Sequence, residues 1–411
     1  MGLFMMKFSF SQNGLFAGAL AVVFAWGLLA TQSSAGAGVN VIAWGAGTIS
    51  NTADGPDYGQ SEVPGNLTNA VQVAGGEWHS LALKADGTLE GWGDNGAHEL
   101  VIPDYSNYVA IACGAHFSLA LQSSGTVVAS LGDDSFGQTE VPDGLTNIVA
   151  IACGYYHGVA LQSDGTVVAW GANGPMGEID FGQTIVPDGV TNVVAIAAGG
   201  YHTLALEANG TLAEWGDQTT AGIPPGLSNV VAIATGAEHN IALLASGYVV
   251  AWGINTYGQT DIPVGLSNVV AIAAGGWHTL ALKTNGTVVA WGAGVGSNAN
   301  VDFNQTVVPV GLSNVVQVTG GLYNSLALKG TGPPTLKAPL TANGLGTNGF
   351  EIALPTRNGR VYQLEYVNSL TNQASQEWMT LPLQFGTGGT IQLNDPSAAA
   401  SSQRFYQVIR W

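Results

Sequence analysis

The sequence predicts an all-β protein that consists of a seven-bladed β-propeller followed by a small β-sandwich-like domain. Three observations lead to this prediction. A unit of about 40 residues, a length typical of propeller blades, recurs seven times in the sequence. Each unit alternates runs of β-branched residues with turn sequences, as strands and hairpins do. The last unit is incomplete, and the segment that it lacks stands before the first unit.

The clearest unit covers residues 268–292 and reads NVVAIAAGGWHTLALKTNGTVVAWG. The units can be counted by a Trp before Gly, or by the residue that replaces it. This position is occupied by Trp44, Trp92, Leu131, Trp170, Trp215, Trp252 and Trp291. A Pro that opens a turn gives the same count of seven, at Pro64, Pro103, Pro142, Pro187, Pro224, Pro263 and Pro309.

Four antiparallel strands are expected in each unit. The run NVVAIAA predicts a strand buried on both faces, and HTLALK predicts the strand that follows it. Asn285-Gly286 and its equivalents tolerate positive φ angles, so they predict a two-residue hairpin into the third strand, TVVAWG. After a loop of variable length, a short fourth strand such as QTDIP leads into a Pro-x-Gly turn.

The two ends of the repeat region predict a closed ring. The seventh unit stops after its second strand, at Lys329, and residues 40–45 read NVIAWG, a copy of the missing third strand. We therefore expect the N-terminal strand to pair with the last blade, which removes exposed strand edges.

Residues 1–37 are predicted to be a signal peptide, because an apolar stretch over residues 14–30 is followed by small residues. A retained membrane anchor is the alternative, since about 17 apolar residues approach the length that spans a bilayer. The expected location of the protein is secreted, cell-surface or periplasmic, with no membrane span after cleavage. The propeller is assigned to residues 38–330.

A different domain follows a linker at residues 331–336. Residues 337–411 lack the repeat, and the sequence indicates five strands there, at residues 350–354, 361–367, 378–383, 390–394 and 405–409. The motif Gly344-x-Gly346-x-x-Gly349 precedes a strand and not a helix, so it is interpreted as a linker and not as a nucleotide site. The domain is expected to attach the protein to a surface or to cap the ring.

Charge restricts the class of partner. The chain has a net charge of −18, and between residues 39 and 330 only Lys84, Lys283 and Lys329 stand against 23 acidic residues. Such a field disfavours nucleic acid and anionic lipid and favours a basic partner or cations. Acidic charge that only maintains solubility is the alternative interpretation.

No motif of a known catalytic or metal site is present, and no cofactor is expected. A column of histidines is better explained by packing and a backbone hydrogen bond than by a metal ring, because each member belongs to a different blade. The column is His79, Phe117, His157, His202, His239, His278 and Asn324. Cys113 and Cys153 occupy the same position in adjacent units, where either a disulfide or two buried thiols would fit.

Variation between the units falls mostly on one face of the ring. In an up-and-down blade, the first and third connections emerge on the same face. The residues directly before the histidine column and the acids directly after the Trp-Gly position lie in these connections, as do long insertions at residues 46–60, 172–183 and 293–305. They form the predicted partner-binding set, Trp78, His116, Tyr156, Tyr201, Glu238, Trp277, Tyr323, Asp94, Asp133 and Asp217.

Units such as VVAWGINTYGQTDIPVGLSNVVAIAAGGWHTLALK resemble regulator-of-chromosome-condensation repeats. They are most similar to the secreted short-repeat branch that includes the propeller-type β-lactamase inhibitors. That branch binds its target enzyme through aromatic residues and aspartates on one face. The resemblance therefore implies a binding role for Trp78, Tyr156, Tyr201, Trp277, Tyr323, Asp94, Asp133 and Asp217.

The sequence is interpreted as a secreted, non-enzymatic, monomeric propeller that binds an extracellular or surface protein through its variable face. Rigid aromatic side chains bury a large area at a small cost in entropy, which suits protein binding. Glycan binding by the same aromatic residues is the alternative function. A hydrolase or lyase that uses Glu178, Asp180 and Asp302 is a third reading, because carboxylates from different loops can form an acid/base pair.

Overall fold

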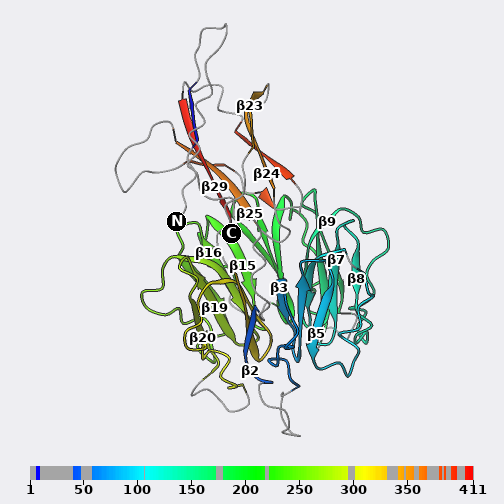
Figure 1. Cartoon of the computed structure of the whole chain (residues 1–411). Coiled ribbons are helices and arrows are strands. Elements are labelled where there is room, and N and C mark those ends of the chain that lie inside the picture. Colours follow the sequence, from blue (N-terminus) through cyan, green and yellow to red (C-terminus); the bar gives the residue numbers. More distant parts are fainter. Residues whose placement is uncertain are drawn as a thin grey trace.

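The structure is a computed structural model (Figure 1). It describes residues 6–9, 40–47, 58–105, 107–172, 179–217, 222–294, 301–330, 341–346, 349–355, 361–367, 379–381, 384–385, 390–395 and 403–410. Strands are the regular secondary structure in this part of the chain, and it contains no helix long and apolar enough to cross a membrane. The all-β prediction is confirmed.

Seven antiparallel sheets of three strands each form the blades of the ring. Blades 1 to 4 contain β3 (Ala70–Gly75), β4 (His79–Lys84) and β5 (Leu89–Gly93); β6 (Tyr108–Cys113), β7 (Ser118–Gln122) and β8 (Val127–Ala129); β9 (Ile148–Cys153), β10 (His157–Gln162) and β11 (Val167–Gly171); and β12 (Val193–Ala198), β13 (His202–Glu207) and β14 (Leu212–Gly216).

Blades 5 to 7 repeat the same order. They contain β15 (Val230–Thr235), β16 (His239–Leu244) and β17 (Val249–Gly253); β18 (Val269–Ala274), β19 (His278–Lys283) and β20 (Val288–Gly292); and β21 (Val315–Gly320), β22 (Asn324–Lys329) and β2 (Val41–Gly45). The middle strand of each blade is almost completely buried, as in β13, where Leu204 and Leu206 are inaccessible to solvent.

The expected fourth strand is wrong for the six blades whose fourth segment before the Pro is described, and part of that segment in blade 4 lies outside the described residues. The segments that contain the Pro landmarks are turns and irregular backbone within the described residues. The backbone carbonyl of a Gln in most of these segments accepts a hydrogen bond from the Trp indole of the next blade, for example Trp215 Nε1 to Gln183 O at 2.9 Å. The segment is therefore held by bonds to the neighbouring blade and not by a ladder to its own.

The hairpin between the second and third strands is one residue longer than predicted. In blade 1, Lys84 N donates to Thr88 O and Gly87 N donates to Lys84 O, which encloses a loop of three residues. Gly87 has a φ of 79°, whereas Asp86 is not in the left-handed region and its Oδ1 accepts from Thr88 N. A turn with a single left-handed glycine is the common three-residue hairpin.

The predicted closure of the ring is confirmed. β2 pairs antiparallel with β22, from Val41 opposite Leu328 to Gly45 opposite Asn324. Val41 and Trp44 are buried, so the N-terminal strand completes the packing of blade 7 as well as its hydrogen bonds. Hydrophobic packing and backbone pairing therefore both join the two ends of the ring.

Two glutamines reinforce the junctions on either side of β3. Gln317 accepts from Val73 N at 3.2 Å and donates to Val73 O at 3.1 Å, which joins β21 to β3. Gln72 makes the same pair of bonds with Ile111 of β6. The other five units carry Ala at this position. Among the described residues, these side-chain amide links between inner strands therefore occur at the two junctions of blade 1, with blade 7 and with blade 2.

The second domain contains two sheets, as predicted, and β25 of one contacts β28 of the other. Its strands lie together on one side of the ring in Figure 1, and β27 lies against β12. The first sheet contains β23 (Thr341–Gly346), β24 (Gly349–Pro355) and β28 (Thr390–Asp395). The second contains β1 (Met6–Ser9), β29 (Gln403–Arg410), β25 (Val361–Val367), β26 (Met379–Thr380) and β27 (Gln384–Phe385).

Two sequence interpretations of these flanking segments change. The glycine motif at Gly344, Gly346 and Gly349 is not a linker, because it lies in β23 and at the start of β24, which pair with each other. β1 pairs with β29 although it lies inside the predicted signal peptide. The remainder of that segment, its cleavage site and the linker at residues 331–336 lie outside the described residues, and cleavage stays a prediction.

Deletion of residues 39–45 is expected to lower the melting temperature of the ring by many degrees. It removes the buried Trp44 side chain, a loss that costs about 3–5 kcal/mol in protein cores, and it exposes the edge of β22. Thermal unfolding followed by circular dichroism measures the effect. Deletion of residues 1–37 is the control, since it leaves β2 in place. An unchanged melt after the first deletion would contradict closure.

Candidate functional site on the aromatic face of the ring

The structure brings the two predicted site columns together at one mouth of the ring, which we call the site face. In every blade the residue after the Trp-Gly position donates its backbone N–H to the carbonyl of the residue before the histidine column, at 2.7–3.0 Å. The donor and acceptor residues are Ala46 and Tyr323, Asp94 and Trp78, Asp133 and His116, Ala172 and Tyr156, Asp217 and Tyr201, Ile254 and Glu238, and Ala293 and Trp277.

Nine of the ten predicted site residues are half-buried, and Glu238 is exposed. Half-burial means that one side of each aromatic ring packs on the protein while another side meets solvent. The aromatic members of the set therefore pack against the blades and also reach the surface.

A second aromatic column on this face was missed by the sequence reasoning. It consists of Tyr58, Phe136, Phe181, Tyr257 and Phe303. Each lies two residues before a Gln of the irregular fourth segment. The Gln Oε1 accepts the backbone N–H of the aromatic residue, as in Phe181 N to Gln183 Oε1 at 2.7 Å. The recurring sequence pattern aromatic-x-Gln is the signal that could have identified this second aromatic column.

Each member of the second column contacts the pre-histidine residue of the following blade. The ring centroids are 5.0 Å apart for Tyr58 and Trp78 and 5.2 Å apart for Phe181 and Tyr201. The same holds for Phe136 with Tyr156, Tyr257 with Trp277 and Phe303 with Tyr323. Contacts between neighbouring blades extend these pairs, for example Trp277 to Tyr323 at 5.4 Å. The aromatic residues therefore form arcs around the mouth, and Glu238 of blade 5 interrupts them.

The histidine column joins the blades from within. His157 Nε2 lies 3.1 Å from Thr203 Oγ1 of the next blade, and Thr203 donates its own proton to Gln183 O at 2.9 Å. The hydroxyl must therefore accept from the imidazole, which places the proton on Nε2. His79, His202, His239 and His278 make the equivalent bond to Ser118, Asn240, Thr279 and Ser325.

These histidines are held neutral by burial. Desolvation lowers the pKa of His79, His157, His239 and His278 to about 3, because the interior cannot solvate an imidazolium. No group of three or more potential metal ligands occurs among the described residues. What the geometry shows for the column is a set of hydrogen bonds between blades.

Phe117 interrupts the histidine column for a reason that lies in the next blade. Gly158 of blade 3 stands where other blades place the hydroxyl or amide partner. A Cβ on Gly158 would lie 2.4 Å from the ring of Trp170, so that space is filled. With no polar partner across the junction, a buried Phe is favoured over a His with an unsatisfied nitrogen.

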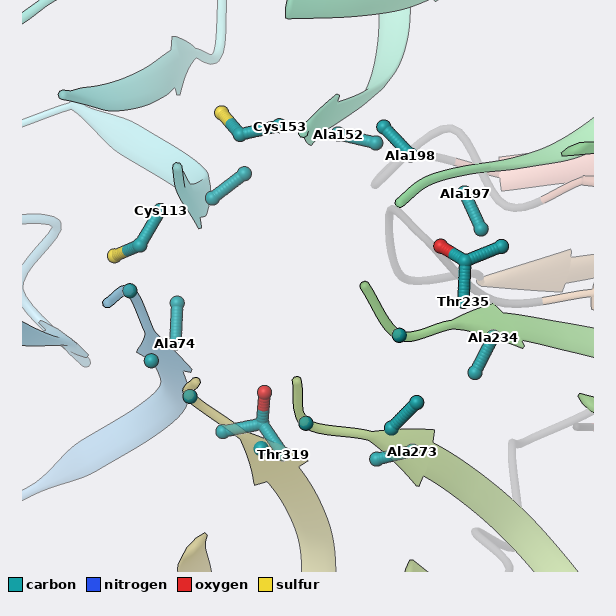
Figure 2. Close-up of a pocket in the computed structure, with 18 of the residues that line it drawn as sticks. Ala74, Cys113, Ala152, Cys153, Ala197, Ala198, Ala234, Thr235, Ala273 and Thr319 are labelled. Carbon is teal, nitrogen blue, oxygen red and sulfur yellow. The ribbon is translucent and has the colours of Figure 1, made fainter. Parts of the chain in front are cut away.

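Of the two alternatives for the cysteines, a disulfide or two thiols, the structure has thiols, since Cys113 and Cys153 are both free. They lie at the channel, where small side chains from the inner strands surround a cavity of about 390 Å³. Figure 2 shows both sulfur atoms directed away from the channel. Cys113 packs in the cluster between blades 1 and 2, and Cys153 packs between blades 2 and 3, so different layers separate the two sulfurs.

The aspartates of the site face have structural partners. Asp133 Oδ1 accepts from Ser135 N at 3.0 Å, and Asp94 Oδ1 accepts from Gly96 N at 3.0 Å, so both order their own loops. Asp180 accepts from Gly182 N and Asp302 accepts from Asn304 N in the same way. Glu178 lies outside the described residues. The hydrolase or lyase reading gains no support from these contacts.

Stability is expected to fall between pH 6.5 and pH 4 because of the histidine column. The folded-state pKa of about 3 lies below the ordinary value of 6.5, so the unfolded chain binds protons that the folded ring excludes. The stability is fully present above pH 6.5 and is lost as the pH falls toward 3. Each histidine contributes roughly 1.4 kcal/mol per unit of pKa difference.

The variant His278→Asn isolates this effect, because Asn324 already occupies the same position in blade 7. Its melting temperature is expected to fall less steeply than that of the wild type between pH 6.5 and pH 4. Differential scanning calorimetry over this range measures both slopes. Equal slopes would show that the histidine is not a source of the pH dependence.

Comparisons with known proteins agree with this geometry. The family model described as regulator of chromosome condensation (RCC1) repeat matches residues 70–98, 148–183, 230–259 and 269–298. Protein pim1 of Schizosaccharomyces pombe is 31% identical over 85 residues, in a match that covers 14% of this chain and 16% of that protein. The chain therefore spans about a sixth of the length of this curated relative.

Solved structures show the same fold at low sequence identity. Prp20p of Saccharomyces cerevisiae is 21% identical, with 72% of this chain and 92% of that chain covered and a TM-score of 0.55. Human WBSCR16 is 20% identical, with 71% and 99% covered and a TM-score of 0.52. The repeat match and the shared fold together show that the ring of this protein is a propeller of the RCC1-repeat type.

Proposed function

We propose that the propeller is a non-catalytic protein-binding module, and that the site face is where its partner binds. The observation that carries this proposal is the arcs of aromatic side chains around one mouth, each fixed by the neighbouring blade and each partly open to solvent. Rigid, pre-ordered aromatic residues are the side chains that most often dominate protein interfaces, because little side-chain entropy is lost on binding.

The distribution of charge supports a basic partner. Lys84, Lys283 and Lys329 are the only lysines or arginines between residues 39 and 330. Each ends the middle strand of its blade, and the first residue of that strand belongs to the site face. Five residue steps of about 3.3 Å place these cations roughly 17 Å away, at the opposite face. Within the described part of the ring, the carboxylates of the site face therefore have no lysine or arginine beside them.

The relatives support protein binding in general terms. Prp20p binds Gsp1p and histones. A second structure shows Prp20 bound to Kap60. At 20–21% identity this likeness concerns the fold, so none of these partners is transferred to this chain. Export to the cell surface or periplasm rests on the signal-peptide prediction and belongs to the same proposal.

The double variant Trp277→Ala, Tyr323→Ala is expected to lose the partner. These two rings lie 5.4 Å apart on the site face, and removal of two interface aromatic residues typically weakens binding by well over tenfold. The measurement is quantitative affinity capture with the full chain from cell-surface and secreted extracts. Proteins bound by the wild type should be depleted at least about tenfold on the variant.

The matched control is Val264→Ser, Val310→Ser. Both valines are fully exposed at turns of the opposite face, so this variant also removes two apolar side chains but should retain the partner. Equal capture by the site-face variant and the wild type would contradict the proposal. Retention on a glycan array without any protein partner would instead favour glycan binding.

A further inference from the structure

The residues two positions before the histidine column surround the axis of the ring at the site face. Five backbone hydrogen bonds of 2.9–3.4 Å join consecutive members around the mouth, and a sixth runs from Leu322 N to Gly76 O at 2.9 Å. These positions are Glu77, Ala115, Tyr155, Gly200, Ala237, Gly276 and Leu322, and all line the channel. Because most are small, Glu77 and Tyr155 are the polar side chains that this ring presents at the mouth.

The backbone ring is open at one junction. No bond from Glu77 N to blade 2 accompanies the six others among the described residues. The same junction lacks the usual Trp, since Leu131 replaces it and is 68% exposed, and Glu99 replaces the usual Gln. A surface cavity of about 610 Å³ lies here beside His116. A junction at which several features of the repeat are missing together is expected to belong to a functional site.

Glu77 is a desolvated acid without a strong counter-ion. Its side chain is 17% exposed, and the nearest cationic candidate is His116 Nε2, 3.7 Å from Glu77 Oε2. Burial raises the pKa of Glu77, and the attraction of His116 only partly opposes this rise. A carboxylate in such a place gains more from a full positive charge at contact distance than an exposed one does.

Two buried polar atoms beside Glu77 also lack partners. Trp78 Nε1 and the Tyr155 hydroxyl oxygen are inaccessible to solvent and have no hydrogen-bond partner among the described residues. The ring of Tyr155 keeps some exposure and lies over Gly200, where a Cβ would come within 3.2 Å of it. Burial raises the pKa of Tyr155, and the negative charges of Glu77 and Glu238 raise it further.

We propose that the channel mouth at the junction of blades 1 and 2 receives one lysine or arginine side chain of the partner protein, with the Glu77 carboxylate as its counter-ion. The faces of Trp78 and neighbouring tyrosines provide cation–π attraction. The proposal rests on the proposed function, because it names the chemistry of the group that the site face recognises.

The charge of the face excludes the other ligand classes. An anion would meet Glu77, Glu238 and the loop aspartates with no lysine or arginine nearby. A metal ion would require a cluster of three or more ligating side chains, which the described residues do not contain. The channel walls are mostly Ala and Gly, so small side chains leave its interior open to a long cationic side chain.

The test uses the full chain and a fluorescein-labelled peptide of alternating glycine and lysine. Fluorescence anisotropy should show that Glu77→Gln weakens binding at least about tenfold, as loss of one partner of a partly buried ion pair does. Glu140→Gln is the matched control, since it removes the same charge from an exposed side chain and should change binding less than about twofold. The same peptide with every lysine acetylated should bind at least about tenfold more weakly.

Melting temperatures of the wild type and of both variants show whether each is folded. Equal affinity of the wild type and Glu77→Gln, or of the lysine and acetyl-lysine peptides, would overturn the proposal. Capture of the natural partner by Glu77→Gln but not by Trp277→Ala, Tyr323→Ala would reject this inference and leave the proposed function intact.

Discussion

At five of its seven junctions the ring depends on the same buried acceptor between blades, the backbone carbonyl of the Gln in the irregular fourth segment. At the junction of blades 3 and 4, Gln183 O accepts from the Trp215 indole and from the Thr203 hydroxyl, each at 2.9 Å. Thr203 in turn accepts from His157. An unsatisfied buried donor costs roughly 1–3 kcal/mol. Each group in this series of hydrogen bonds therefore holds the others in place.

The same Gln connects the stability of the ring to its site face. Its side-chain amide accepts the backbone N–H of the aromatic residue two positions earlier, as Gln259 does for Tyr257 at 2.9 Å. The aromatic ring then packs against the pre-histidine residue of the following blade, Trp277. Residues that join the blades therefore also set the positions of the aromatic side chains, and these need no reordering when a partner binds.

The repeat sequence predicted the fold because its signals are local. The alternation within HTLALK, the glycine of each hairpin and the copy of a third strand at residues 40–45 all describe short stretches of backbone. The fourth strand was wrong for the same reason, since QTDIP has the composition of a strand but bonds to the next blade and not to its own. The hairpins were wrong by one residue, because Asp-Gly fits both two-residue and three-residue turns.

The sequence by itself determined the number of blades, the closure of the ring and the face on which the units differ, because each follows from positions in the repeat. Tertiary structure alone decided which side chains meet. Phe117 is explained only by Gly158 across the junction, the two thiols point into different layers, and Glu77 stands beside His116 and Tyr155 of other blades. These contacts join residues about 40 or more positions apart. Their geometry depends on how the blades pack around the axis, which no single unit encodes.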